Sequence, residues 1–338
     1  MQGYVPGEQP QDAGIVKLNT NENPYPPAPG VARALRDFSA ASLRLYPDPL
    51  CRALCAKIAE LHGVRSEQVL VANGSDEVLA LCARAFAERD GTIGFFEPSY
   101  SLYPVLAQIE DVRTRPVPLT PEFEWALPAD YAASLFFLTN PNAPTGMLYL
   151  EATVRDFCAS FDGVVLMDEA YVDFARRDLM DLARTSDRVI VARTLSKSFS
   201  LAGLRLGYAV GPAPLIDALH KIKDSYNVDR LAQELGLAAL SELPHMRANA
   251  ARVIATRERT AAALAELGFW VFPSEANFLW VRPPGAPAET VFRALRERKI
   301  FVRYFPGPST GACLRISIGT DGDMERLLAA LRRIPGAH

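Results

Sequence analysis

Two patterns of apolar residues alternate along the chain. Short uninterrupted apolar runs such as TIGFF, SLFFLTN and VIVART occur at residues 92–96, 134–140 and 189–194, and runs of this kind are typical of strands buried on both faces. Other segments carry apolar residues at helical spacing, and the one at residues 51–63 stops at Gly63, as a helix C-terminus does. We therefore expect strands and helices in alternation.

This alternation predicts an α/β fold in which a mostly parallel sheet is covered by helices on both faces. A long helical region is expected from about residue 214 to 267, and the residues after it form a compact set of strands and helices. We expect three parts: a proline- and asparagine-rich arm with the start of the small domain (1–35), a large α/β domain (36–240), and a smaller C-terminal α+β domain (241–338).

Composition narrows the class of protein. Of the 338 residues, 49% are apolar and 22% charged, with a formal net charge of −3, so we expect a globular protein with no nucleic-acid partner. No stretch approaches the roughly 20 apolar residues that a membrane span needs, and the polar N-terminus does not resemble a signal peptide. The five scattered cysteines include no CxxC pair, which predicts a reduced cytoplasmic setting and no metal site.

The segment TLSKSFSLAGLRLGY, residues 194–208, is the strongest chemical signal. Lys197 follows an apolar strand, where a buried amine can condense with an aldehyde and later carry a proton. Small residues on either side leave space for a planar cofactor, and Arg205 could hold a phosphate with its planar fork. Taken alone, a serine–lysine pair fits a surface lysine better.

A second segment, GVVLMDEAYVDF (163–174), places Asp168 at the end of an apolar strand with Tyr171 three residues later. A buried carboxylate needs a cationic partner, and the protonated nitrogen of a pyridine ring is one. Tyr171 could donate a hydrogen bond to an oxygen of the same ring. The plain alternative is that Asp168 caps the end of the strand.

Two loops complete the pattern. NPNAPTG (140–146) follows a strand at the edge of the sheet where open α/β proteins bind ligands. In ANGSDE (72–77), we expect Ser75 to cap a helix whose start can bind an anion. Alone, either loop is equally consistent with an ordinary turn or a capped helix.

Together these segments resemble the fold-type I pyridoxal-phosphate aminotransferases over nearly the whole chain. Within that superfamily, the sequence is similar to the histidinol-phosphate aminotransferase family. The similarity rests on LNTNENPYPPAP, RLYPDP, TLSKSFSLAGLRLGY, DSYNVDRLAQ and CLRISIG.

The resemblance implies that Lys197 binds pyridoxal 5′-phosphate as a Schiff base and carries a proton during the reaction, with Asp168 and Tyr171 as the other catalytic residues. Asp168 pairs with the ring nitrogen, Tyr171 contacts the ring oxygen, and Tyr100 stacks on the ring. The resemblance also implies a homodimer in which Tyr46 reaches the phosphate of the second subunit. The remaining residues expected around the phosphate are Gly74, Ser75, Asp76, Ser196 and Arg205.

On the substrate side, the resemblance implies contacts from Tyr25, Asn277, Arg303 and Arg315. Arg315 matches the superfamily's carboxylate-binding arginine, and a guanidinium suits this role because it binds a carboxylate through two parallel hydrogen bonds. Arg303 lies in the strand-like stretch FVRYF, where the alternative is a solvated edge residue.

Two positions depart from the family pattern. The family usually has asparagine immediately before PTG, bonded to the ring oxygen, and here that position is Ala143. Asn142 could reach the same atom, or Tyr171 could make that bond alone. In the arm, PYPP replaces the common PYGP, which changes the flexibility of a segment expected to close over the substrate.

The reaction implied by the resemblance is amino-group transfer between histidinol phosphate and 2-oxoglutarate. It follows a ping-pong route, in which the amino donor and the 2-oxo acid bind and react in turn. A threonine-phosphate decarboxylase and an aromatic-amino-acid aminotransferase are alternatives on the same scaffold. A catalytically inactive binding protein is a further alternative, but it would not need Lys197, Asp168, Tyr171 and Arg205 together.

Overall fold

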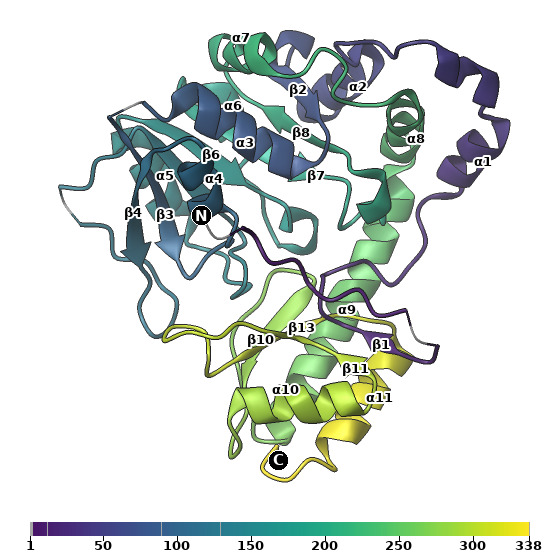
Figure 1. Cartoon of the computed structure of the whole chain (residues 1–338), viewed down its shortest axis with the longest axis vertical. Helices are drawn as coiled ribbons and strands as arrows, with labels where there is room; N and C mark the ends of the chain where they lie inside the picture. The colour runs from purple at the N-terminus through teal and green to yellow at the C-terminus, as the bar shows by residue number, and fades with distance from the viewer. Residues whose placement is uncertain (1–2, 12, 89, 129, 338) are drawn as a thin grey trace.

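The computed structural model describes residues 3–11, 13–88, 90–128 and 130–337. Within them, a large α/β part carries a seven-stranded sheet and a smaller part carries a four-stranded sheet (Figure 1). The large sheet has the order β2-β8-β7-β6-β5-β3-β4. Its strands are β2 (Val69–Ala72), β3 (Thr92–Glu97), β4 (Arg113–Pro118), β5 (Leu135–Thr139), β6 (Val164–Asp168), β7 (Val189–Thr194) and β8 (Gly207–Val210).

The large sheet is mostly parallel, as expected from the sequence. Strand β8 pairs antiparallel with both β2 and β7, whereas the other strand pairs are parallel. Buried residues alternate between its two faces: Leu135 and Phe137 face one side, and Phe136 and Leu138 face the other. Both faces are therefore apolar, which explains why these strands appear as continuous apolar runs.

Helices cover both faces. One face packs against α3 (Ser75–Phe86), α4 (Tyr103–Ile109) and α7 (Ala213–Ile222). The opposite face packs against α2 (Arg52–His62), α5 (Glu151–Ser160), α6 (Leu182–Thr185) and α8 (Arg230–Leu240). Helix α1 (Pro29–Asp37) packs on α8, at the side of the molecule where α1 and the residues just after it protrude (Figure 1).

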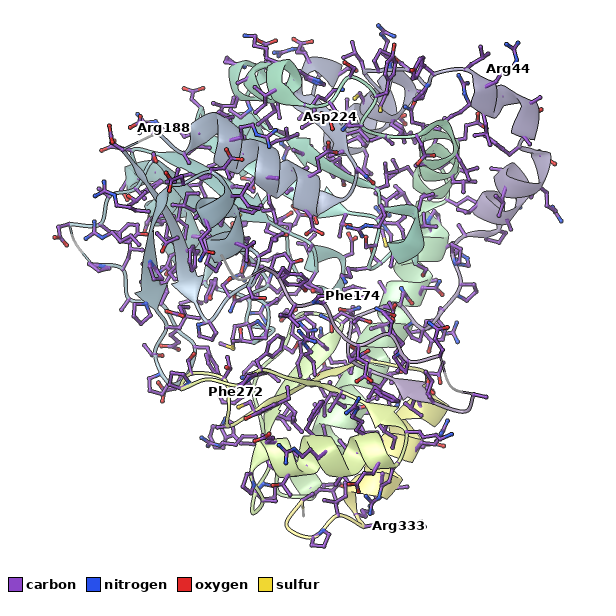
Figure 2. All side chains as sticks on the ribbon, viewed as in Figure 1. Arg44, Phe174, Arg188, Asp224, Phe272 and Arg333 are labelled. Atoms are coloured by element: carbon purple, nitrogen blue, oxygen red, sulfur yellow. The ribbon has the colours of Figure 1, made fainter. Side chains whose placement is uncertain are left out.

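The smaller part follows α9 (Leu243–Glu266), which runs from the large part to the small one (Figure 1). Figure 2 shows Phe174 at the junction of the two parts, where its carbonyl accepts a hydrogen bond from Arg257 of α9. The small sheet has the order β12-β13-β10-β9 and is flanked by α10 and α11. Its elements are β9 (Trp270–Val271), β10 (Phe278–Arg282), α10 (Ala288–Glu297), β12 (Arg303–Tyr304), β13 (Leu314–Ser317) and α11 (Asp321–Leu331).

The N-terminal segment joins the small part by a short parallel pair of strands. Strand β1 (Val16–Lys17) pairs with β11 (Ile300–Phe301). We propose that the domain limits lie where the sequence predicts them, near residues 35 and 240, because β1 belongs with the small part and α9 begins at residue 243. Among the described helices, none is long and apolar enough to cross a membrane.

Candidate active site

A cavity of about 850 Å³ opens at the carboxyl ends of the central parallel strands. Thr139, Asp168 and Thr194, which line it, are the last residues of β5, β6 and β7. Ligands of open α/β sheets bind at this edge. The cavity collects most of the residues predicted from the sequence: Ser75, Asp76, Tyr100, Asp168, Tyr171, Ser196, Lys197, Arg205, Arg303 and Arg315.

Lys197 lies in the loop that follows β7 and points into the cavity. Its Nζ donates a hydrogen bond to the Thr20 carbonyl at 3.3 Å. Burial, together with the positive charge of Arg315, lowers the pKa of Lys197 to about 8. A sizeable fraction of this amine is therefore uncharged near neutral pH, which is the form that attacks an aldehyde.

Asp168 ends β6 with only 4% of its surface exposed. Its carboxylate accepts hydrogen bonds from the backbone N–H of Ala170 at 3.1 Å and from the Tyr103 hydroxyl at 3.0 Å. Burial raises the pKa of Asp168 to about 6, although these two hydrogen bonds oppose the shift. A carboxylate in this position favours a cationic ligand group.

Tyr171 follows Asp168 by three residues, and a residue of the N-terminal arm holds its hydroxyl group. The Asn21 side-chain amide donates to the Tyr171 oxygen at 3.0 Å, and Asn21 in turn accepts from Ser317 at 2.8 Å. Burial raises the pKa of Tyr171, so the phenol keeps its proton at neutral pH. Because its oxygen accepts from Asn21, the Tyr171 hydroxyl can donate into the cavity.

The start of α3 forms a narrow cup. Helix α3 begins at Ser75, so Gly74 with a φ of 86° holds the capping position, and our expectation that Ser75 is the cap was wrong by one residue. A Cβ on Gly74 would lie 2.7 Å from Arg205 Nη2, and one on Gly207 would lie 2.5 Å from the Ser75 nitrogen. Only glycine allows this close approach, which brings the helix N–H groups and a guanidinium together.

Arg205 connects the two sides of the cup. Its Nη1 donates to Ser196 Oγ at 3.3 Å, and its Nη2 pairs with Asp76 at 3.1 Å. The residue itself adopts a left-handed conformation with a φ of 55°. Hydroxyl, guanidinium and helix N–H donors thus converge on one point, a donor set suited to a phosphate.

The opposite wall carries two arginines from neighbouring strands of the small sheet. Arg303 and Arg315 are register partners in the β12–β13 ladder, and both guanidinium groups lie within 5.2 Å of the Phe305 ring centre. Arg315 donates to the Asn19 carbonyl at 3.0 Å, while its buried Nε has no partner among the described residues. An anion entering the cavity would meet both guanidinium groups.

The N-terminal segment occupies the other side of Arg303. The two terminal nitrogens of Arg303 donate to the carbonyls of Val5 and Pro6 at 2.8 and 3.1 Å. Tyr4 packs edge-on against Tyr100 with ring centres 5.7 Å apart. The segment therefore crosses the cavity mouth between the large and small parts (Figure 1).

Five predicted residues do not line the cavity. Asn142 is fully buried, and its amide donates to the Pro98 carbonyl and to Thr145. Gly74 lies behind the cup described above. Asn277 donates to the Asn21 carbonyl at 2.9 Å and so supports the arm from behind.

Tyr25 and Tyr46 lie farther out. The Arg252 guanidinium stacks 3.5 Å from the centre of the Tyr25 ring. Tyr46 is 76% exposed and its ring stacks on Tyr226 at 4.3 Å. Within one chain, neither tyrosine reaches the cavity lining.

The sequence reasoning missed two residues that contact predicted ones, and a third that supports one of these two. Asn21 bonds Tyr171, Tyr103 bonds Asp168, and the Thr139 hydroxyl bonds Tyr103. Tyr103 is the second tyrosine of the segment that contains Tyr100, and the two rings meet edge-on with centres 5.7 Å apart. Within the described residues, no group of three His, Cys, Asp or Glu side chains could hold a metal ion.

The profile of the family described as aminotransferase class I and II matches residues 13–331. The chain belongs to this family. It is 45% identical over 339 residues to the histidinol-phosphate aminotransferase of Geobacter sp. (strain M21), covering 99% of this chain and 97% of that relative.

Two solved structures share this fold. The histidinol-phosphate aminotransferase from Sinorhizobium meliloti, in complex with pyridoxal-5′-phosphate, superposes with a TM-score of 0.85 at 25% identity and covers 95% of this chain and 90% of its own. The L-threonine-O-3-phosphate decarboxylase from Porphyromonas gingivalis superposes with a TM-score of 0.83 at 21% identity, covering 94% and 99%. That second likeness shows the fold alone.

Family membership confirms the expected fold class, the aminotransferase activity and pyridoxal phosphate as cofactor. The residues present fit that cofactor. A partly buried amine (Lys197), a buried carboxylate (Asp168) and the phosphate donors Ser196 and Arg205 lie around one cavity.

Proposed function

We propose that this aminotransferase exchanges an amino group between histidinol phosphate and 2-oxoglutarate, a step of histidine biosynthesis. The relative that is 45% identical over nearly the whole chain carries this activity in its name. The observation that carries the proposal is the pair Arg303 and Arg315, which face the cavity from adjacent strands opposite Lys197. Two guanidinium groups suit substrates that bring a phosphate in one half-reaction and two carboxylates in the other.

Five residues of the cavity have a defined role in this proposal. When bound, pyridoxal phosphate supplies a ring that withdraws electrons from the substrate carbon bearing the amino group. Asp168 would place a negative charge at the ring nitrogen, and Tyr171 would donate a hydrogen bond to the ring oxygen. Ser196 and Arg205 would hold the phosphate of the cofactor.

Lys197 moves the proton. Its pKa of about 8 means that both the charged and the uncharged amine are populated near neutral pH. The uncharged amine can remove the proton from the substrate carbon, and the resulting ammonium can return it. The same group therefore acts first as base and then as acid.

A single-turnover measurement tests the reaction. Holoenzyme mixed with glutamate alone should release one equivalent of 2-oxoglutarate per active site and then stop. Added imidazole acetol phosphate should restart the reaction and yield histidinol phosphate, measured by mass spectrometry. Release of carbon dioxide from threonine phosphate, with no product from glutamate, would instead identify a decarboxylase.

A panel of amino donors tests the substrate. Histidinol phosphate should have a kcat/KM at least about tenfold above that of phenylalanine or tyrosine, because only the phosphate ester can use a second arginine. Equal values for phenylalanine and histidinol phosphate would favour an aromatic-amino-acid aminotransferase.

The proposal includes a homodimer in which Tyr46 reaches the cofactor phosphate of the second subunit. Tyr46 is exposed together with Leu35, Leu43, Leu45 and Leu50 on the protruding segment of residues 35–50, where Figure 2 labels Arg44. Exposed apolar side chains gathered in one region are typical of a protein interface.

Mixed dimers test this arrangement. Lys197→Ala and Tyr46→Ala subunits, each nearly inactive alone, should regain up to half of the wild-type activity when they are mixed and reassembled. One site of the hybrid then has Lys197 from one subunit and Tyr46 from the other. Hybrids confirmed by sedimentation that stay inactive would refute the crossing tyrosine.

We also propose a cytoplasmic location. The five cysteines are free thiols and buried, and burial raises the pKa of the Cys55 thiol to about 11. Unpaired thiols of this kind suit a reducing compartment. Fractionation of the native cells, followed by an activity assay, tests the location.

A further inference from the structure

Three hydroxyl groups lie in a row behind Asp168. The Tyr103 hydroxyl donates to Asp168 Oδ2 at 3.0 Å and is also hydrogen-bonded to the Thr139 hydroxyl. Ser99 Oγ lies 3.2 Å from Thr139 Oγ1 and donates to Asn142 Oδ1 at 3.1 Å. Thr139 and Tyr103 form a hydroxyl chain that ends at the carboxylate, and Ser99, whose one proton goes to Asn142, lies beside this chain.

The fold fixes each member of the hydroxyl chain. Thr139 and Asp168 are register partners at the ends of β5 and β6, and Tyr103 is the first residue of α4. The Tyr103 ring is fully buried and stacks on Phe137 with centres 4.7 Å apart, while Tyr100 meets it at 87°. With its ring held on two sides, the Tyr103 hydroxyl oxygen is fixed between Thr139 and Asp168.

The direction of the hydrogen bond follows from the chemistry. Burial and the nearby charge of Asp168 raise the pKa of Tyr103 well above its usual value, so the phenol keeps its proton. That single proton is given to Asp168, and Tyr103 therefore accepts the proton of Thr139. A donor aimed at a carboxylate stabilises the ionised form over the protonated one.

We propose that Tyr103, supported by Thr139, is a positioning residue that keeps Asp168 ionised and aimed at the ring nitrogen of the cofactor. This inference rests on the proposed transamination, because that reaction depends on a protonated ring nitrogen.

The affinity for the cofactor should depend on pH through the charge of Asp168. Asp168 in the protein without cofactor titrates near pH 6, and its charged form is the one that pairs with the ring nitrogen. Cofactor affinity should therefore fall as the pH drops below about 6. Tyr103→Phe removes a donor from the carboxylate and raises the pKa of Asp168 further, so the fall should begin about one pH unit higher.

The test measures the Kd of pyridoxal phosphate for cofactor-depleted protein between pH 5 and pH 9. Near pH 5, Tyr103→Phe should bind the cofactor about tenfold more weakly than wild type, and near pH 9 the two should agree within about twofold. Tyr149→Phe is the matched control, since Tyr149 is also buried and its hydroxyl has no partner among the described residues. It should follow the wild-type curve.

A cofactor analogue separates positioning from packing. In 1-deazapyridoxal phosphate a CH group replaces the ring nitrogen, so the analogue cannot pair with Asp168. Tyr103→Phe should not weaken its binding. If Tyr103→Phe weakens both ligands by the same factor at every pH, Tyr103 only packs and the proposal is wrong.

A second variant keeps the proposal testable if Tyr103→Phe does not fold. Thr139→Val removes the hydroxyl behind Tyr103 and should shift the same pH curve in the same direction by a smaller amount, and an unshifted curve would overturn the proposal. These binding measurements need no turnover. A wild-type enzyme that binds the cofactor but fails to transaminate histidinol phosphate would refute the proposed function and leave the result for Tyr103 standing.

Discussion

The two walls of the cavity are built differently. On the cofactor wall, Asp168, Lys197 and Ser196 lie at or just after strand ends of one sheet, and their neighbours come from adjacent strands and the start of α3. On the substrate wall, Arg315 meets the carbonyl of Asn19, which lies 296 residues earlier in the chain. The cofactor wall is built mainly on one sheet, with added contacts from the arm to Lys197 and Tyr171. The substrate wall is assembled from distant segments.

The hydrogen-bond partners differ in the same way. Arg205 on the cofactor wall is held by the side chains of Ser196 and Asp76, whereas Arg303 and Arg315 donate to backbone carbonyls of the N-terminal segment and arm. A cofactor that stays bound is suited to a preformed wall, while substrates that come and go need a wall that can open. The comparison predicts that substitutions on the cofactor wall affect both half-reactions. Substitutions on the substrate wall should weaken the binding of substrates and leave the binding of the cofactor nearly unchanged.

The largest effect is expected on the cofactor wall. Lys197→Ala should lower kcat by at least about 1,000-fold for every amino donor, because it removes the base and the amine that binds the cofactor. Steady-state kinetics and the visible absorbance of bound cofactor measure this. Lys221→Ala, which changes an exposed lysine paired with Asp217, should stay within twofold of wild type. Turnover of Lys197→Ala near the wild-type rate would remove this lysine from the mechanism.

An intermediate effect is expected from Arg315→Lys. The charge remains but the planar fork is lost, so kcat/KM for glutamate and 2-oxoglutarate should fall about 100-fold. The Kd of pyridoxal phosphate should change by less than about threefold, since Arg315 is on the opposite wall. Arg282→Lys, on the exposed side of the same sheet, is the control. An equal loss of cofactor and substrate binding would show that the two walls do not act separately.

The smallest effect is expected at the N-terminal segment. Deletion of residues 1–11 removes the carbonyls that hold Arg303 and frees its guanidinium for an anion. Inhibition by inorganic phosphate should strengthen by about two- to tenfold, the value of one net hydrogen bond. Adding Arg303→Gln to the deletion should cancel this gain. Unchanged inhibition in the deletion variant would mean that the segment does not compete for Arg303.

The same contrast decides what could be predicted from the sequence. Asp168 and Lys197 were placed correctly in the cavity because each follows an apolar run, and the carboxyl ends of parallel strands meet at one edge. Asn142 satisfies the same rule, yet its amide turns into its own loop toward Pro98 and Thr145. A strand end predicts the position of a residue but not the direction of its side chain.

The substrate wall was harder to predict. Arg303 was identified through resemblance, but its partners are the carbonyls of Val5 and Pro6, and a backbone carbonyl has no signature in the sequence. Tyr103 escaped notice because its helix is short and its role depends on meeting β6, 65 residues later. Contacts between distant segments depend on how the whole chain packs, which local patterns do not report.

The antiparallel strand β8 has a further consequence. Because β8 turns back along β7, with Thr194 opposite Gly207, both Lys197 and Arg205 lie in one closed loop. The length of this loop limits the distance between the Lys197 amine and the Arg205 guanidinium. It therefore also limits the length of a molecule that can contact both groups. A residue inserted between positions 198 and 204 would increase this distance while β7 and β8 stay paired.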